Sequence, residues 1–268
     1  MAFIPSPAQS VLQLGPITVH FYGLMYVFAL VAAVAITRRR WEAAGGSAAD
    51  VIRAATWGFP AGLVGGRLYF LLTSWDQAPH TWWGPFAIWQ GGLGSWGGIA
   101  AGSATALWVL RRDVDVARLA DAAVPGLLVG WSIGRVGNYF NQELFGLPTR
   151  LPWGLEISPA HRPAGYANFA TFHPTFLYEI LWNLALAGVL VSLAYRRPLA
   201  RGVLFSLYVA GYGLGRIFEE LVRIDPSHHV LGLRLNFFVA ATWAAGGAAW
   251  AWRCSRQPRT RLRPSTSP

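Results

Sequence analysis

The sequence contains no lysine, a single cysteine and few charged residues. All 22 basic residues are arginine, and the abundant alanine and glycine beside them indicate a coding bias rather than a function. One cysteine, Cys254, excludes an intramolecular disulfide and a metal site built from cysteines. Charged residues make up 13% of the chain, whereas soluble domains usually carry about 25%. These shortages argue against a soluble globular protein.

Apolar residues are abundant instead. They make up 54% of the chain, with 14 tryptophans, and the mean hydropathy is +0.36, values typical of polytopic membrane proteins. A net charge of +10 raises the alternative of a nucleic-acid partner. However, the arginine clusters follow apolar segments or fill the short loops between them, at 38–40, 111–118, 196–201 and 253–263. This is the positive-inside pattern of membrane proteins, so we expect no nucleic-acid partner.

Seven apolar segments are long enough to cross a bilayer, which takes roughly 20 residues. They are 17–37, 54–73, 86–110, 119–140, 174–194, 203–221 and 235–252. We therefore predict an all-α polytopic membrane protein with seven transmembrane helices. Placing the arginine-rich loops inside puts the N-terminus outside and the C-terminus inside. We expect one transmembrane domain over 1–252, with a small external element at 141–173, and a polar cytoplasmic tail over 253–268 that is disordered.

Five ionisable residues stand out inside the predicted spans, where each costs free energy to insert. In the predicted orientation most of them lie in the outer third of the bilayer. For a single arginine, an alternative is that its side chain extends to the outer interface, but several charges at one depth favour a polar site. The residues are Arg67, Arg135, Glu179, Arg216 and Glu220.

The sixth predicted span places Tyr212, Arg216, Glu220 and Arg223 on one stripe of a helix, at i, i+4, i+8 and i+11. A glutamate between two arginines can orient them by ion pairing. The planar fork of arginine suits phosphate oxygens, and the nearest phosphates at this depth belong to phospholipid headgroups. The residues alone therefore predict binding or processing of an outer-leaflet phospholipid, without choosing a reaction.

Other functions remain open at this point. A transporter of anions or lipid phosphates would also place arginines in a membrane cavity, whereas a purely structural subunit would not need so many buried charges. An intramembrane serine protease needs a serine–histidine pair, and Ser95 lacks the sequence context for one. The glycines at 94, 98 and 102 favour close helix packing over a phosphate loop.

The segment "GRVGNYFNQELFG", residues 134–146, resembles the signature of bacterial prolipoprotein diacylglyceryl transferases. Four further blocks resemble that family in the same order: "HFYGLMY" from residue 20, "GGRLYF" from 65, "HPTFLYE" from 173, and the stripe over 212–223. The resemblance covers about residues 15–250. The positions that match the signature are Arg135, Gly137, Asn138, Asn141, Glu143 and Gly146.

The resemblance implies a seven-span fold and a reaction. The diacylglyceryl group of phosphatidylglycerol moves to the lipobox cysteine thiol of a prolipoprotein, a thioether forms, and glycerol-1-phosphate leaves. This is the first step of bacterial lipoprotein maturation. The implied place is the bacterial cytoplasmic (inner) membrane, with a multi-pass protein whose active site faces the outer leaflet. The partners implied are phosphatidylglycerol, prolipoprotein signal peptides and the bilayer; no cofactor and no metal are expected.

The resemblance also implies roles for individual residues. Arg135 and Arg216 are expected to stabilise the negative charge that grows on the leaving phosphate. Asn138 and Asn141 either hold headgroup hydroxyls or satisfy backbone groups at the span end. The expected catalytic residues are Arg135, Arg216, Tyr22 and Glu220, and the expected phosphatidylglycerol-binding residues are Arg135, Asn138, Asn141, Glu143, Gly146, Tyr212, Arg216 and Arg223.

Alternatives remain for the other side chains. Glu143 and Glu220 orient arginines, or one of them is the base. Tyr22 and Tyr212 bond a phosphate oxygen, or line the cavity, because tyrosine is common at membrane interfaces.

One position departs from the family pattern. Many members have a histidine just before a Gly-Gly pair in the third span, and this histidine is regarded as the base that deprotonates the thiol. This chain has Trp96 at that position. Tryptophan has no basic nitrogen. His20 and His173, near the outer ends of their spans, are candidate bases, although a histidine beside a proline is often structural. The interpretation favoured here is that Arg135 and Arg216 lower the pKa of the thiol through their positive charge.

Overall fold

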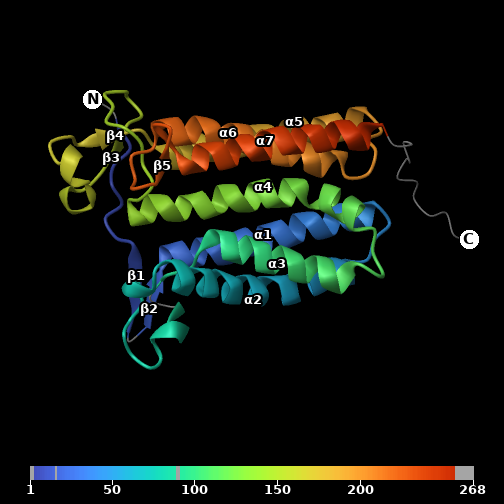
Figure 1. Ribbon diagram of the computed structural model, residues 1–268, viewed down its shortest axis with the longest axis horizontal. Helices are drawn as coiled ribbons and strands as arrows, with labels where there is room; N and C mark the ends of the chain where they lie inside the picture. Colours follow the sequence, from blue (N-terminus) through green and yellow to red (C-terminus); the bar gives the residue numbers. More distant parts are fainter. Residues whose placement is uncertain (1–2, 16, 89–90, 257–268) are drawn as a thin grey trace, which may run out of the picture. The chain divides into compact units, whose positions relative to one another are not determined.

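The computed structural model describes residues 3–15, 17–88 and 91–256. This part of the chain is mostly helical (Figure 1). Its α-helices are α1 (Phe21–Ala43), α2 (Ala48–Thr73), α3 (Ser95–Leu110), α4 (Val116–Asn141), α5 (Thr175–Arg196), α6 (Val203–Val222) and α7 (Leu235–Ser255). Short 3-10 helices are η1 (Trp75–Gln77), η2 (Gly84–Phe86), η4 (Pro159–His161) and η5 (Ala164–Tyr166).

Three small antiparallel strand pairs accompany the helices. β1 (Val11–Leu14) pairs with β2 (Ile17–His20), β3 (Leu155–Glu156) with β4 (Thr171–Phe172), and β5 (His229–Val230) with β6 (Leu233–Arg234). In the last pair His229 lies opposite Arg234. The turn between β5 and β6 holds two residues in the left-handed region, Leu231 and Gly232, with φ of 51° and 79°. This hairpin carries Arg234 to the first turn of α7.

The predicted spans correspond to the seven helices, with two errors at their starts. Residues 17–20 form strand β2, so the first helix begins at Phe21. The third predicted span, 86–110, began too early, because α3 starts at Ser95. Gly91 and Gly92 precede it with φ of 88° and 76°, a conformation that no α-helix contains. By length and apolar composition, three of the described helices are candidates to cross a membrane: α1, α4 and α5.

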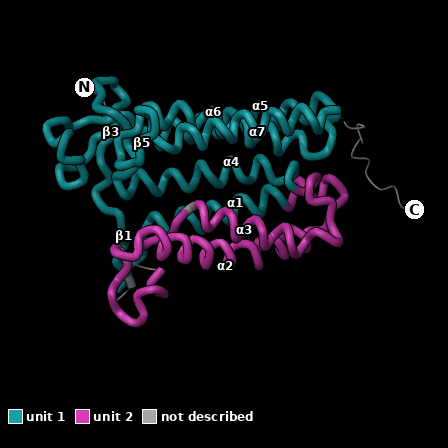
Figure 2. The backbone as a smooth tube through the Cα atoms, in the orientation of Figure 1, with its two compact units in different colours: residues 1–37, 120–262 teal, residues 38–119, 263–268 magenta. Residues whose placement is uncertain are grey.

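The described residues divide into two compact units (Figure 2): one contains residues up to 37 together with 120–256, and the other contains 38–119. In the second unit, α2 and α3 pack through glycines. A Cβ atom on Gly98 would lie 3.3 Å from the carbonyl oxygen of Gly62, and one on Gly102 only 3.0 Å from that of Gly58. The predicted packing role of these glycines is confirmed. The expected tail is helical up to Ser255, and residues 257–268 lie outside the described residues.

The first unit is built on α4, α5 and α6. Its apolar core joins Val124 and Leu128 of α4 to Leu190 of α5 and to Leu204 and Tyr208 of α6. All of these lie toward one end of the helices, whereas Arg135, Glu179 and Arg216 of the same three helices lie toward the other.

Segment 141–173, expected as an external element, contains β3, η4, η5 and β4. It has a small core of its own, formed by Phe145, Leu155, Ile157 and Phe172. The Gly146 amide donates to the carbonyl of His173 at 2.9 Å, and a bridge pairs Gly146 with Arg223. A Cβ atom on Gly146 would lie 2.7 Å from a side-chain carbon of Val222. Glycine at this position therefore lets the segment after α4 approach the end of α6.

Candidate functional site

The C-terminal end of α4 forms the first part of the site. Arg135 donates through Nη1 to Oδ1 of Asn138 at 3.1 Å, and Asn138 donates through Nδ2 to Oε1 of Glu143 at 2.8 Å. Asn141 donates to the same carboxylate oxygen at 3.3 Å. The sequence prediction grouped these four residues, and the structure brings them together as one hydrogen-bonded chain.

The turn after α4 explains how Glu143 reaches back. Gln142 has φ of 51°, its amide donates to the carbonyl of Tyr139, and the Glu143 amide donates to the carbonyl of Asn138. This is the hydrogen-bond pattern of a Schellman cap, which usually takes glycine at the left-handed position. Leu144 is also left-handed, with φ of 58°. Two non-glycine residues in this region cost conformational energy, which is typical of functional sites.

Glu179 of α5 connects the arginines of two other helices. Its Oε2 lies 2.5 Å from Nε of Arg135 and 3.4 Å from Nη1 of Arg216. Its Oε1 accepts a hydrogen bond from the Tyr212 hydroxyl at 3.2 Å. The glutamate side chain is only 4% exposed. One buried carboxylate thus holds Arg135 of α4 and Arg216 of α6 on either side of itself.

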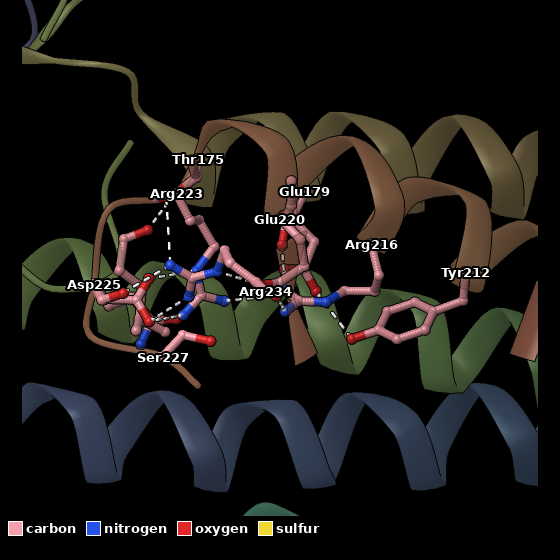
Figure 3. A network of polar contacts seen from close by, with 12 residues as sticks. Thr175, Glu179, Tyr212, Arg216, Glu220, Arg223, Asp225, Ser227 and Arg234 are labelled. Carbon is pink, nitrogen blue, oxygen red and sulfur yellow. Dashed lines mark hydrogen bonds and ion pairs between the residues drawn. The ribbon is translucent and has the colours of Figure 1, made fainter. Parts of the chain in front are cut away.

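Along α6, Arg216 pairs with Glu219 and Glu220, three and four residues further on. Glu220 in turn pairs through Oε2 with Nε of Arg234 at 2.7 Å and lies 3.7 Å from Nη1 of Arg223. Figure 3 shows this alternation of acidic and basic side chains from Tyr212 to Asp225. The predicted stripe on α6 is therefore one ion-pair network.

The far end of the network lies outside α6. Arg223 binds both carboxylate oxygens of Asp225, at 2.7 and 2.9 Å, and Arg234 binds the same carboxylate at 2.9 Å. Burial of Asp225 works to raise its pKa, but the hydrogen bonds and charges of Arg223 and Arg234 outweigh it, so the pKa of Asp225 lies below its usual value. Arg223 was predicted to bind phospholipid. In the structure its guanidinium group is paired with Asp225 and lies near Glu220.

The other predicted residues have more local contacts. The hydroxyl of Tyr22 lies 3.1 Å from that of Tyr26. A Cβ atom on Gly137 would lie 2.8 Å from the ring of Tyr22, so this glycine lets α1 approach α4 between Arg135 and Asn138. Nδ1 of His173 lies 2.9 Å from the Tyr178 hydroxyl, and burial lowers the pKa of this imidazole. His20, the last residue of β2, is exposed.

Arg67 and Trp96 belong to the other compact unit. The Arg67 guanidinium donates to four backbone carbonyls, those of Gly84, Pro85, Gly91 and Gly92, at 2.7–2.9 Å. These bonds give this buried arginine a local role in holding the loop between η2 and α3. Trp96 is on the first turn of α3 and is 41% exposed.

Comparison with known proteins decides the family. The profile described as "Prolipoprotein diacylglyceryl transferase" matches residues 9–253. The chain belongs to the prolipoprotein diacylglyceryl transferase family. Across 258 residues it is 45% identical to "Phosphatidylglycerol--prolipoprotein diacylglyceryl transferase 2" of Streptomyces coelicolor, covering 93% of this chain and 80% of the relative. "Phosphatidylglycerol--prolipoprotein diacylglyceryl transferase" of Cutibacterium acnes is 48% identical over 238 residues, covering 87% of this chain and 80% of the relative.

Membership in the prolipoprotein diacylglyceryl transferase family confirms the resemblance found in the sequence, and with the apolar helices it supports a membrane protein.

A cavity of about 340 Å³ lies beside the ion pairs, between α5 and α6. Its walls carry polar groups (Glu179, Arg216, Glu219) and apolar ones (Trp182, Phe218). Within the described ranges, no group of three or more His, Cys, Asp or Glu side chains is arranged to hold a metal ion.

Sequence reasoning missed three members of the site of this prolipoprotein diacylglyceryl transferase homologue, Glu219, Asp225 and Arg234. Glu179 was placed in the predicted polar site, but its role between Arg135 and Arg216 was not foreseen. Glu219 was overlooked beside Glu220, although it lies three residues after Arg216. Asp225 and Arg234 follow the sixth span, where helical spacing carries no information about which side chains meet.

The completed network has more acidic than basic groups. Its four arginines face five carboxylates, so its formal charge is one negative when all are ionised. The members are Arg135, Arg216, Arg223, Arg234, Glu143, Glu179, Glu219, Glu220 and Asp225.

Proposed function

We propose that this chain transfers the diacylglyceryl group of phosphatidylglycerol to the lipobox cysteine thiol of prolipoproteins, the first step of bacterial lipoprotein maturation. The observation that carries the proposal is the meeting of Arg135 and Arg216 on one buried carboxylate beside a cavity, in a chain of this family. The curated relatives carry the names of enzymes with these two substrates.

In the transfer, the thiol sulfur forms a bond to the glycerol carbon that bears the phosphate. The carbon–oxygen bond to the phosphate breaks, and glycerol-1-phosphate leaves with the electron pair. Negative charge grows on the phosphate oxygens as the bond breaks. Arginine donors aimed at those oxygens stabilise this charge more in the transition state than in the ground state. Arg135 and Arg216 carry this role, and Glu179 keeps their guanidinium groups in place while the site is empty.

The remaining polar groups position these two arginines. Glu220 and Arg234 hold Arg216 through the network, and Asn138 holds Arg135. Tyr212 donates a hydrogen bond to Glu179 on the cavity wall. When a lipid phosphate binds, the same hydroxyl can donate to a phosphate oxygen instead. Asn141 and Glu143 lie at the same end of α4 and suit the headgroup hydroxyls. Gly146 and Arg223 support the site through the backbone and through Asp225.

The thiol needs a proton acceptor, since only a few per cent of a thiol with pKa near 8.5 is ionised at pH 7. The carboxylates around Arg135 and Arg216 offset the positive charge that would lower the thiol pKa, so the electrostatic route loses its main support. Glu219 is a better acceptor. It lies on the cavity wall, where it pairs with Arg216 and interacts with Glu179. His20 and His173 are the alternatives.

The membrane arrangement is part of the proposal. Seven helices cross the bacterial cytoplasmic membrane, with the N-terminus outside and the C-terminus inside, and the site faces the outer leaflet. Two features support it: the described arginines at 38–40, 111–118, 196–201 and 253–256 fall at one end of successive helices, and the site residues fall at the other.

The direct test incubates the purified full-length protein with phosphatidylglycerol and a lipobox peptide, followed by mass analysis. We expect a peptide heavier by one diacylglyceryl group and an equal amount of glycerol-1-phosphate. A peptide with serine in place of the cysteine is the matched control and should gain no mass. Movement of a labelled lipid phosphate across vesicles, with no adduct on the peptide, would instead support the transporter.

A further inference from the structure

Asn183 of α5 is a buried polar side chain that the transfer chemistry does not use. It is fully buried, with 0% exposure, and neither its Oδ1 nor its Nδ2 has a hydrogen-bond partner within the described part of the chain. Ser206 of α6 is equally buried, but its hydroxyl donates to the carbonyl of Val203 at 2.8 Å. Burying an amide without partners is unfavourable, and native proteins rarely leave one so. The amide of Asn183 therefore requires a partner that the chain does not supply.

The cavity between α5 and α6 offers a place for that partner. Asn183 lines this cavity together with Trp182, Phe218 and the arginine-binding Glu179. The volume, about 340 Å³, and the aromatic side chains of Trp182 and Phe218 on its wall suit part of an acyl chain.

The position of Asn183 along α5 indicates which part of a lipid it meets. It follows Glu179 by four residues, which is about 6 Å along a helix. In a phospholipid, five bonds separate the phosphorus atom from the carbonyl carbon of the nearest acyl ester. At the reach per bond of an extended chain, that is also about 6 Å. A phosphate at Arg135 and Arg216 therefore places an ester carbonyl beside Asn183.

We propose that Nδ2 of Asn183 donates a hydrogen bond to an acyl ester carbonyl of the substrate lipid, and that the cavity holds the first part of that acyl chain. This inference rests on the proposed function and deepens it, since it assigns a subsite for the diacylglyceryl group. The carbonyl oxygen of Asn183 stays available for a water molecule that enters with the ester. The subsite selects lipids with ester-linked chains over lipids with ether-linked chains, because an ether oxygen is a weak acceptor.

The experiment compares diester phosphatidylglycerol with its diether analogue as donors to a lipobox peptide. The wild-type protein should prefer the diester by about fivefold to tenfold in kcat/KM, where tenfold corresponds to about 1.4 kcal/mol. Asn183→Leu, which removes the amide and keeps a branched side chain, should bring this ratio close to one. Ser206→Ala is the matched control: it removes an equally buried polar group outside the cavity and should keep the wild-type ratio.

The possible outcomes distinguish a failure of the proposed subsite from a failure of the proposed function. No thioether from either lipid with the wild-type protein would reject the proposed function. If the wild-type protein and Asn183→Leu form the thioether with the same preference for the diester, the subsite is rejected. Asn183 would then be hydrogen-bonded by water alone. Should Asn183→Leu fail to fold, the infrared band of a ¹³C-labelled ester carbonyl, measured on lipid bound to the wild-type protein, decides the matter. The band should shift to lower wavenumber, and an unshifted band would reject the hydrogen bond.

Discussion

Replacing Arg216 tests the core of the proposed mechanism. Its guanidinium contacts Glu179, Glu219 and Glu220, and its side chain is 16% exposed. Loss of a preorganised donor to a developing oxyanion typically lowers kcat by about 10²–10³, or about 3 kcal/mol. We expect a loss of this size from Arg216→Ala. Arg216→Lys should restore less than about tenfold, because one ammonium cannot form the planar fork that pairs two oxygens.

Loss of stability has to be separated from loss of catalysis. The 3.4 Å separation between Arg216 and Glu179 corresponds to about 5 kcal/mol of gross attraction at an effective dielectric of about 20, most of it offset by desolvation. Breaking a buried pair leaves charges without partners, which typically costs about 3–5 kcal/mol. The double variant Arg216→Ala, Glu219→Gln keeps the formal charge of the wild-type network. It should regain much of the thermal stability that Arg216→Ala loses, while its transfer rate stays about 10²–10³ below that of Glu219→Gln alone.

The assay is the initial rate of diacylglyceryl transfer to a lipobox peptide, in membranes with matched protein levels, with thermal unfolding in detergent measured alongside. Arg135→Ala is the parallel variant on α4 and should lose a similar factor in kcat. Near-normal rates in both alanine variants would remove phosphate stabilisation from the mechanism. A double variant whose stability recovers and whose rate equals that of Glu219→Gln alone would show that Arg216 acts only in folding.

Two further predictions concern the orientation and the base. In intact cells, a membrane-impermeant thiol reagent should modify cysteines introduced near residue 160 and spare those near residue 198, and labelling near 198 would reverse the assigned orientation. His20→Gln and His173→Gln should each lose less than about tenfold in initial transfer rate, and Trp96→Phe should keep most activity; a thousandfold loss in either histidine variant, with lipid binding intact, would identify a histidine base.

Much of the helical architecture could be predicted from the sequence, because an apolar run of about 20 residues has few structural alternatives. The errors fell where this criterion fails. The chain enters α1 through residues 17–20, which adjoin the apolar run but pair with β1. The start of α3 was missed because aromatic residues before Gly91 read as part of a span, although positive φ at Gly91 and Gly92 ends any helix there.

The site was partly predictable for a different reason. Arginines inside apolar segments are costly, so Arg135 and Arg216 stood out individually. Their partners did not, because ion pairs between helices depend on packing and not on spacing. Arg234 is the clearest example: it lies fourteen residues after Glu220, and a hairpin turn returns it to 2.7 Å from that carboxylate. Arg67 shows the opposite case, a buried arginine satisfied by backbone carbonyls and needing no ligand.

The negative balance of the network leads to a last prediction, on Glu219. Five carboxylates around four arginines oppose the entry of an anionic lipid phosphate. Transfer of the thiol proton to Glu219 would neutralise one carboxylate while creating the thiolate, so the same step would favour both nucleophile and phosphate. Glu219→Gln removes that charge permanently and also removes the acceptor. It should therefore lower KM for phosphatidylglycerol several-fold and lower kcat by about 10² or more, since a positioned base contributes about 10²–10⁴ in rate. Phe218→Leu, at the adjacent position on the cavity wall, controls for packing and should not lower kcat and KM together. A Glu219→Gln variant with kcat near the wild-type value would show that another group accepts the thiol proton, or that the arginine charges stabilise the thiolate.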